Sequence, residues 1–199
     1  MEKGLLIVIS GFSGVGKGTV IQMVLNELPG LKFSVSCTTR APRAGEEDGV
    51  NYYFLSEEEF ERKIDEGAFI EYTRTFTNYY GTLKSEIDTP IAAGVDILLE
   101  LNVVGAKNIK KLYPDCVTIF VRPPSMEALK ARLVGRGSES PESLERRLNE
   151  IDSESKEIPS YDYVVVNAVA RTCAEEIVGI IRSCLLYTSP SPRDVEESR

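Results

Sequence analysis

The chain has 199 residues, of which 42% are hydrophobic, and its formal net charge is −8. This length suits one compact core with small inserted segments, and no apolar run reaches the length of a membrane span. The acidic balance argues against a protein that wraps DNA or RNA, because such a surface needs a basic face. The chain has four separated cysteines and no histidine, so we expect neither a zinc site nor a histidine general base. We expect the cysteines to be small buried or half-buried thiols, with a redox role for Cys37 as the alternative.

The first apolar run, Leu5–Ile9, is too short for a secretory signal and leads into a glycine-rich loop, so we expect a cytoplasmic protein. Glycines let consecutive N–H groups converge on a polyphosphate at the positive end of a helix, and Lys17 adds an ammonium group. The motif predicts a nucleoside triphosphate site, and a turn that binds nothing is the alternative. Gly18 stands where a Ser or Thr normally reaches magnesium, which leaves Thr19 as the nearest substitute. The loop reads Gly11-Phe12-Ser13-Gly14-Val15-Gly16-Lys17-Gly18-Thr19.

Alternating strand and helix patterns along the chain predict a parallel sheet covered by helices. Thr172 with Glu175 predicts a capping box, and Ser125 after two prolines predicts a helix N-cap. The strand-like runs lie at Leu5–Ser10, Val95–Leu101, Val117–Val121 and Tyr163–Val166. The helical patterns lie at Lys17–Leu28, Gly105–Leu112, Ser125–Val134 and Thr172–Leu186.

Two segments interrupt this alternation. Residues 34–88 predict a small and mostly antiparallel insertion, whose helix begins at Ser56 with Glu59 completing a capping box and Leu55 packing on Phe60. The second segment, from Arg132 to about Glu157, is polar and arginine-rich, with a helix predicted to start at Ser140-Pro141. The strand-like runs of the insertion are Phe33–Ser36, Asn51–Leu55, Phe69–Tyr72 and Tyr79–Gly81.

These patterns divide the chain into a core of residues 1–33, 89–124 and 158–186, an insertion of residues 34–88 and a helical segment of residues 125–157. Residues 187–199 contain Ser, Pro and charged residues without apolar periodicity, and we predict a disordered tail. The run CLLYTSPSPRD also resembles translated adapter sequence, which suggests that this tail is not native.

The insertion carries a second set of phosphate ligands. Arg40 and Arg43 lie around Pro42, and guanidinium groups bind phosphate through paired charge-assisted hydrogen bonds. Tyr52 and Tyr80 can each add a hydroxyl donor, although both would also suit a hydrophobic core. These residues predict a second phosphate site, separate from the loop.

Several ordered motifs resemble those of guanylate kinases. They are SVSCTTRAPRAGEEDGVNYYF at 34–54, FIEY at 69–72, NYYG at 78–81, ILLEL at 97–101 and RLVGRGSESPESLERRL at 132–148, together with the glycine-rich loop. The resemblance covers roughly residues 4–185. It implies an α/β fold of the P-loop NTPase type, with a parallel sheet core, an inserted small α+β domain that binds the nucleoside monophosphate, and a helical lid. Residues 34–88 would be the GMP-binding insertion and residues 125–157 the lid.

On the acceptor side, the resemblance implies a site for GMP. Glu71 can accept the N1–H and 2-amino hydrogens of guanine, and AMP should be rejected because adenine lacks both donors. From pattern alone, Glu71 would read equally well as a solvent-facing strand residue. The residues implied to hold the GMP phosphate are Arg40, Arg43, Tyr52 and Tyr80. Those implied to face the guanine base are Ser36, Glu71 and Thr82, and Glu100 and Asn102 complete the GMP-binding set.

On the donor side, the resemblance implies that ATP is bound by the loop residues Gly11, Ser13, Gly14, Val15, Gly16, Lys17, Gly18 and Thr19, and by Asn167. The implied catalytic residues are Lys17, Arg43, Arg136 and Arg147. Arg136 and Arg147 would close over the transferring phosphoryl group and neutralise its charge. Thr19 and Glu100 are the implied magnesium ligands, partly through water, and a buried structural carboxylate is the alternative for Glu100. The chain departs from the family pattern at Asn102 and Ala168, which replace acids, and at Val104, which replaces Gln.

The implied reaction is ATP + GMP → ADP + GDP, with dGMP as a further acceptor and Mg²⁺ accompanying ATP. The expected partners are the two nucleotides, without nucleic acid or membrane, and we expect a monomer or homodimer. The alternatives are a non-catalytic guanylate-kinase-like binding module and a kinase for another nucleoside monophosphate. Lys17 in an intact loop favours catalysis over the first, and Glu71 with Thr82 favours GMP over the second.

Overall fold

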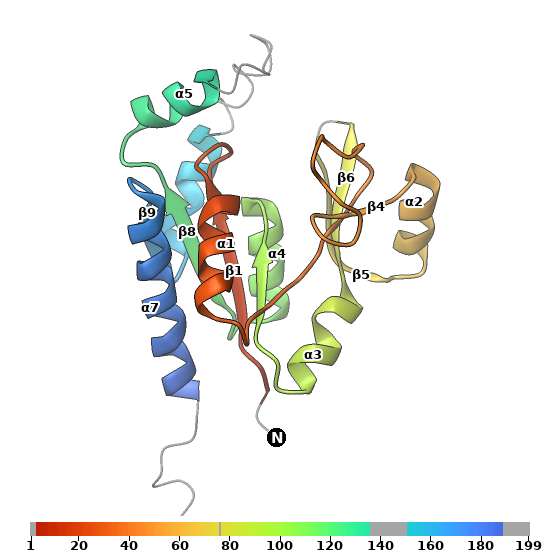
Figure 1. Ribbon diagram of the computed structural model, residues 1–199. Helices are drawn as coiled ribbons and strands as arrows, with labels where there is room; N and C mark the ends of the chain where they lie inside the picture. The colour runs from red at the N-terminus through yellow and green to blue at the C-terminus, as the bar shows by residue number, and fades with distance from the viewer. Residues whose placement is uncertain (1–2, 76, 136–150, 189–199) are drawn as a thin grey trace, which may run out of the picture. The chain divides into compact units, whose positions relative to one another are not determined.

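The structure is a computed structural model of the chain, and it describes residues 3–75, 77–135 and 151–188 (Figure 1). A five-stranded sheet has the order β2-β7-β1-β8-β9, and a four-stranded sheet has the order β4-β3-β6-β5. In the five-stranded sheet the β2–β7 and β8–β9 pairs are parallel. A largely parallel sheet accompanied by helices confirms the predicted α/β class.

Contacts divide the chain into two compact units. The loop unit consists of residues 9–29 and the described residues from 117 to 188, and the insertion unit consists of the described residues in 3–8 and 30–116. Strand β1, Leu6–Gly11, contributes to both, and all of its residues are buried, as its continuous apolar run predicts.

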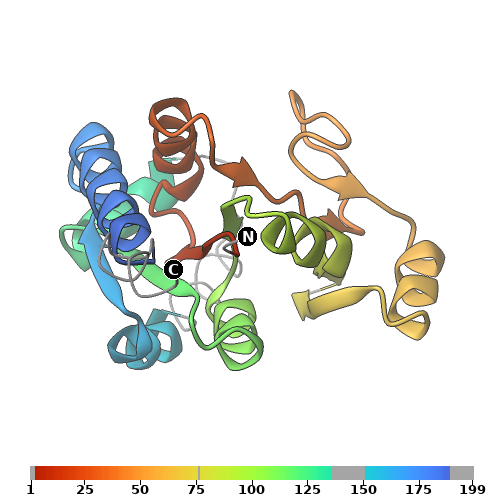
Figure 2. The same cartoon turned by 90° about the horizontal axis from the view of Figure 1, so that it is seen from below.

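The loop unit pairs the helix that follows the glycine-rich loop with the last helix described. Its elements are α1 (Lys17–Glu27), β8 (Val117–Arg122), α5 (Met126–Gly135), η2 (Ile158–Ser160), β9 (Tyr163–Val166) and α7 (Ala170–Thr188), and residues 151–157 are also helical. Helices α1 and α7 pack side by side, in red and blue in Figure 2. Their buried residues recur with helical spacing: Val20, Ile21 and Val24 on α1, and Cys173, Ala174, Ile177, Val178 and Ile181 on α7.

Helix α7 corrects the prediction of a capping box at Thr172. The helix begins at Ala170, so Thr172 lies inside its first turn. The Glu175 carboxylate accepts a hydrogen bond from Arg171 Nε at 2.8 Å, one helical turn away. An ion pair within the helix has therefore replaced the predicted cap. The helix also ends at Thr188 and so includes the first two residues of the predicted tail.

The insertion unit contains the four-stranded sheet and the helices around it. The hairpin of β5 and β6 is antiparallel, β3 pairs antiparallel with β6, and β3 pairs parallel with β4. The elements are β2 (Lys32–Phe33), β3 (Cys37–Thr38), β4 (Tyr53–Phe54), α2 (Glu57–Asp65), β5 (Phe69–Thr75), β6 (Asn78–Leu83), η1 (Lys84–Glu86), α3 (Asp88–Ala92), β7 (Ile97–Glu100) and α4 (Val103–Leu112).

The predicted strand at Phe33–Ser36 is wrong, because its two ends join different sheets. Phe33 belongs to β2 and pairs with Leu98 of the five-stranded sheet. The chain then leaves that sheet, and the Ser36 carbonyl accepts a hydrogen bond from Tyr53 N at 2.9 Å beside the four-stranded sheet. A single alternating run thus spans a boundary that only the partner strands reveal.

Local capping in the insertion unit follows the prediction. Ser56 Oγ accepts from Glu59 N at 3.1 Å, while the Glu59 carboxylate accepts from Ser56 N at 2.9 Å, so the capping box at α2 is confirmed. Phe60 of α2 is fully buried and stacks on Phe69 and Tyr79 of the hairpin, with ring centroids 4.3 and 5.1 Å away. This aromatic stack holds α2 against the sheet.

Candidate nucleotide-binding site

The glycine-rich loop joins β1 to α1 through a backbone that requires glycine. Gly16 is the N-cap residue of α1 with φ of 95°, a left-handed conformation that residues with a Cβ rarely adopt. The first turn of α1 contains no acidic residue, so the positive end of the helix is not neutralised by its own side chains. The other predicted ATP-binding residues follow this path: Gly11 ends β1, Ser13 and Gly14 are half-buried, Val15 is buried, and Gly18 and Thr19 are exposed on α1.

Lys17 folds back over the loop that precedes it. Its ammonium group donates to the carbonyl of Gly11 at 2.8 Å and to that of Phe12 at 3.3 Å. These bonds place a positive charge beside the loop and next to the helix N-terminus, where a phosphate chain is best stabilised. The geometry therefore fits the predicted triphosphate site.

Asn167 supports the loop from the end of β9. Its side chain is 4% exposed, and Nδ2 donates to the carbonyl of Val15 at 2.8 Å. A Cβ at Gly16 would lie only 3.0 Å from the same nitrogen. The family resemblance implies that Asn167 contacts ATP. The structure shows in addition that its side-chain amide holds the backbone of the loop.

Glu71 and Thr82 form a buried polar pair on the β5–β6 hairpin. They are paired in the strand register, Glu71 is 7% exposed, and Thr82 Oγ1 donates to Glu71 Oε1 at 2.9 Å. Burial raises the pKa of Glu71, and the hydrogen bond from Thr82 lowers it by less. The pair presents a carboxylate that Thr82 orients and that retains further acceptor sites.

The N-terminus of α4 lies against the same carboxylate. Asn102 is the N-cap residue, and its Oδ1 accepts from Gly105 N at 2.8 Å. A Cβ at Gly105 would lie 3.0 Å from Glu71 Oε2, so glycine is what leaves room for the carboxylate. Because Asn102 caps the helix, α4 begins at Val103 instead of the predicted Gly105. The structure thus brings together Glu71, Thr82 and Asn102.

A second group of side chains surrounds Arg40. Its guanidinium carbon lies 5.5 Å from the Tyr52 ring centroid, and the rings of Tyr52 and Tyr80 are 6.1 Å apart. Burial and the neighbouring charges of Glu100 and Tyr80 raise the pKa of Tyr52 to about 12, so its hydroxyl stays a donor at neutral pH. These residues can present several hydrogens to an anion.

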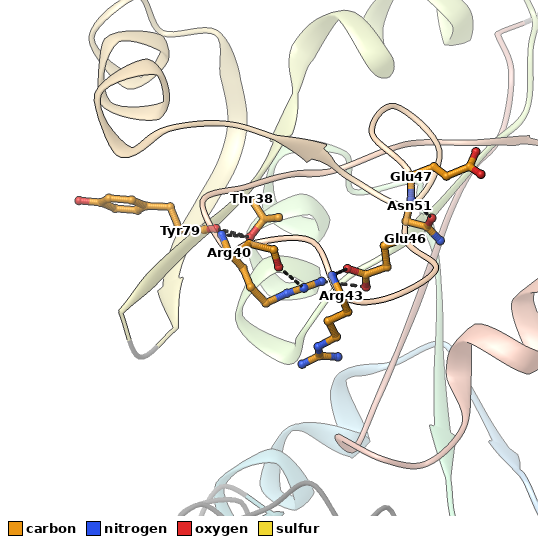
Figure 3. Close-up of polar contacts among 8 residues, drawn as sticks. Thr38, Arg40, Arg43, Glu46, Glu47, Asn51 and Tyr79 are labelled. Atoms are coloured by element: carbon orange, nitrogen blue, oxygen red, sulfur yellow. Dashed lines mark hydrogen bonds and ion pairs between the residues drawn. The ribbon is translucent and has the colours of Figure 1, made fainter.

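Arg40 and Arg43 are joined by Glu46, a residue to which the sequence pattern assigned no role. Glu46 binds the Arg40 side chain and the Arg43 backbone, and the Arg43 side chain extends away from it (Figure 3). An acidic residue inside an arginine-bearing turn was the signal available in the sequence. Two further predicted residues are half-buried: Ser36 lies between β2 and β3, and Glu100 ends β7.

Comparison with known proteins identifies the family. The guanylate kinase family model matches residues 3–183. The chain belongs to the guanylate kinase family. It is 52% identical over 174 residues to the guanylate kinase of Symbiobacterium thermophilum, covering 87% of this chain and 82% of that protein. It is 50% identical to the guanylate kinase of Clostridioides difficile, covering 92% of this chain and 89% of that protein.

A solved structure agrees with this membership. The crystal structure of guanylate kinase from Anaplasma phagocytophilum matches with a TM-score of 0.78 at 32% identity, covering 100% of this chain and 96% of that chain. The family resemblance and the fold class drawn from the sequence are therefore confirmed. Arg136 and Arg147, the predicted catalytic arginines of the guanylate kinase lid, lie outside the described residues, as does the predicted helix start at Ser140-Pro141.

Three further findings concern other chemistry in this family member. Burial raises the pKa of the Cys37 thiol to about 11, which argues against the alternative redox role because the thiolate is the reactive form. In the described ranges, no three His, Cys, Asp or Glu residues gather as a metal cluster. No helix within the described part of the chain combines the length and apolar character needed to cross a membrane.

Proposed function

We propose that the chain transfers the γ-phosphoryl group of ATP to GMP, giving ADP and GDP, and that it also accepts dGMP. The observation that carries this proposal is the buried pair of Glu71 and Thr82. Thr82 occupies one acceptor site of the carboxylate, and the remaining sites suit the adjacent N1–H and 2-amino donors of guanine. A base without those donors would leave a buried carboxylate poorly paired.

The phosphate of GMP would bind to Arg40, Arg43, Tyr52 and Tyr80. Tyr52 supports this role because its ring centroid lies 5.5 Å from the Arg40 guanidinium carbon and its hydroxyl is protonated at neutral pH. The attacking oxygen belongs to a phosphate group that is already anionic, so the reaction needs no strong general base. Positioning and charge neutralisation would supply most of the rate enhancement. Ser36 and Asn102 remain proposed contacts of the guanosine part.

The phosphates of ATP would bind to the N–H groups of the loop and to Lys17, whose ammonium already lies beside the loop carbonyls. Asn167 would support this site by holding the Val15 carbonyl. Arg136 and Arg147 are proposed to close over the transferring phosphoryl group, which would exclude water and spread its charge over two guanidinium groups.

Magnesium fits the residues proposed to hold it. Thr19 and Glu100 offer a hydroxyl and a carboxylate oxygen, the ligand types that Mg²⁺ prefers. Because nucleotide phosphates and water fill most of its coordination positions, the ion needs no dense cluster of protein ligands. When bound with ATP, it would neutralise charge on the phosphate oxygens.

We also propose that the chain acts in the cytoplasm, where its two nucleotide substrates are available, as a monomer or homodimer.

A coupled ADP-release assay tests the proposal by offering GMP, dGMP, AMP, UMP and CMP in turn, with magnesium present and then removed by a chelator. We expect turnover with GMP and dGMP that depends on magnesium. The Lys17→Ala variant should lose turnover while largely retaining GMP binding. Absence of turnover with GMP would refute the proposed activity, and intact GMP binding without turnover would favour the non-catalytic binding module.

A further inference from the structure

Glu46 is the shared acceptor of the turn that carries Arg40 and Arg43. Its Oε1 accepts from Arg40 Nη2 at 2.9 Å, and its Oε2 accepts from the Arg43 backbone N at 2.8 Å (Figure 3). Its own backbone N donates to the Arg43 carbonyl at 3.0 Å. One carboxylate therefore fixes a guanidinium group and closes the backbone turn at the same time.

The Arg40 side chain is held in one orientation by these and other contacts. Its Nη1 donates to the Ala41 carbonyl at 2.7 Å, while the Arg40 backbone is fixed separately by a bond from its N to Thr38 Oγ1 at 3.2 Å. The guanidinium carbon lies 5.5 Å from the Tyr52 ring centroid and 5.8 Å from that of Phe54. A guanidinium has five N–H donors, so these two side-chain bonds leave donors for another anion.

The ion pair differs from exposed pairs in the same unit. The Arg40 and Glu46 side chains are only 15% and 20% exposed, whereas those of Arg62 and Glu66 are 67% and 57% exposed at a distance of 3.8 Å. Burial raises the pKa of Glu46, but the Arg43 N–H and the Arg40 guanidinium together lower it by more. The pKa of Glu46 therefore falls below its usual value. The carboxylate is thus ionised throughout the neutral range, and its bonds are charge-assisted.

We propose that Glu46 is a positioning residue for the acceptor phosphate, because it holds Arg40 and closes the Arg43 turn before a phosphate monoester binds. This inference rests on the proposed function. Ordering a long arginine side chain opposes binding, and an arginine that is already ordered avoids that cost. Simple charge repulsion predicts the opposite change in GMP affinity. A carboxylate beside the site repels a phosphate, so removing the carboxylate would strengthen GMP binding.

The test compares Glu46→Gln and Glu46→Ala with the matched control Glu47→Gln in the full chain. Glu47 is exposed, its backbone N bonds to Asn51 Oδ1 at 2.9 Å, and its carboxylate points away from both arginines (Figure 3). Titration calorimetry with GMP and with guanosine separates the phosphate contribution from that of the base. We expect both Glu46 variants to bind GMP about 10-fold more weakly, because binding must then order the Arg40 side chain, and we expect guanosine binding to be unchanged.

Steady-state kinetics should then show a raised KM for GMP and an unchanged KM for ATP, and Glu47→Gln should match the wild type. Equal or tighter GMP binding by Glu46→Gln would overturn the inference, as would an equal loss for GMP and guanosine. If Glu46→Ala does not fold, Glu46→Gln decides alone, because it keeps the size of the side chain. A wild-type chain that does not phosphorylate GMP would refute the proposed function, whereas wild-type turnover with an unaffected Glu46→Gln would refute only the positioning role.

Discussion

The substitution Glu71→Gln tests whether the buried Glu71 carboxylate recognises the guanine base. The wild-type carboxylate is 7% exposed and, among the described residues, receives its side-chain hydrogen bond from Thr82 at 2.9 Å. Glutamine preserves the size of the side chain and an oxygen for Thr82. It replaces the second oxygen with an NH₂ group, which opposes the guanine donors instead of accepting from them.

The expected magnitude follows from the loss of one charge-assisted hydrogen bond. Such a bond contributes about 1.5–3 kcal/mol, so the affinity for GMP should fall by about 10-fold to 150-fold. AMP presents an acceptor at N1, which the new NH₂ group can satisfy, so its kcat/KM should hold or rise. The ratio of kcat/KM for GMP over AMP should therefore fall by at least about 10-fold.

The assay is ADP release with each nucleotide at varied concentration, and ATP saturation serves as the internal control. An unchanged GMP-to-AMP ratio in Glu71→Gln would remove Glu71 from the base site and refute the reasoning. A change in the KM for ATP alone would have the same consequence.

The raised pKa of Glu71 adds a dependence on pH. Guanine needs the ionised carboxylate, so wild-type affinity for guanosine should fall as pH decreases through that raised pKa, and Glu71→Gln should not show this fall. Guanosine is the suitable ligand because a phosphate group titrates near pH 6 itself. The folded chain holds this proton to a higher pH than the unfolded chain does, so stability decreases as pH rises between the two pKa values. At neutral pH, Glu71→Gln should therefore unfold at a higher temperature than the wild type.

Three further substitutions probe contacts that the structure defines. Gly105→Ala adds a Cβ 3.0 Å from Glu71 Oε2 and should raise the KM for GMP about 10-fold, although alanine favours the helix; an unchanged KM would mean that the carboxylate has room to move. Asn167→Ala removes the 2.8 Å bond to the Val15 carbonyl and should raise the KM for ATP by about 5-fold or more without affecting GMP binding, and an equal effect on both nucleotides would contradict this. Phe60→Ala removes a fully buried ring and should lower the free energy of unfolding by about 3–5 kcal/mol in a denaturant titration, a loss below about 1 kcal/mol being inconsistent with the aromatic stack.

The sequence predicted best the features that depend on neighbours within one turn. The capping box of Ser56 and Glu59 formed as predicted, and Ser125 Oγ accepts from Ala128 N at 3.2 Å at the start of α5. The capping box predicted at Thr172 did not form, because the helix already begins at Ala170 and Glu175 pairs with Arg171. A cap depends on the backbone conformation of one residue, which pattern alone does not fix.

Strand boundaries were harder to predict from the sequence than helix caps, because a strand is defined by hydrogen-bond partners that are distant in the sequence. Phe33 and Cys37 lie four positions apart, yet Phe33 pairs with Leu98 and Cys37 pairs with Tyr53 and Gly81. Phe33, Val35 and Cys37 follow one alternating apolar pattern, so hydrophobicity does not mark where one strand ends and the next begins. Their separation depends on which strand offers hydrogen-bond partners on each side.

By itself, the sequence determined the residue types of the site: a glycine-rich loop with Lys17, two arginines around Pro42, and the motifs that carry the family resemblance. The tertiary structure decided how those groups are held. It set Thr82 against Glu71 across a strand register and brought the Asn167 amide to the Val15 carbonyl, a residue 152 positions earlier. Side-chain chemistry is a property of each residue, whereas the burial and hydrogen bonds that tune it come from segments that only folding brings together.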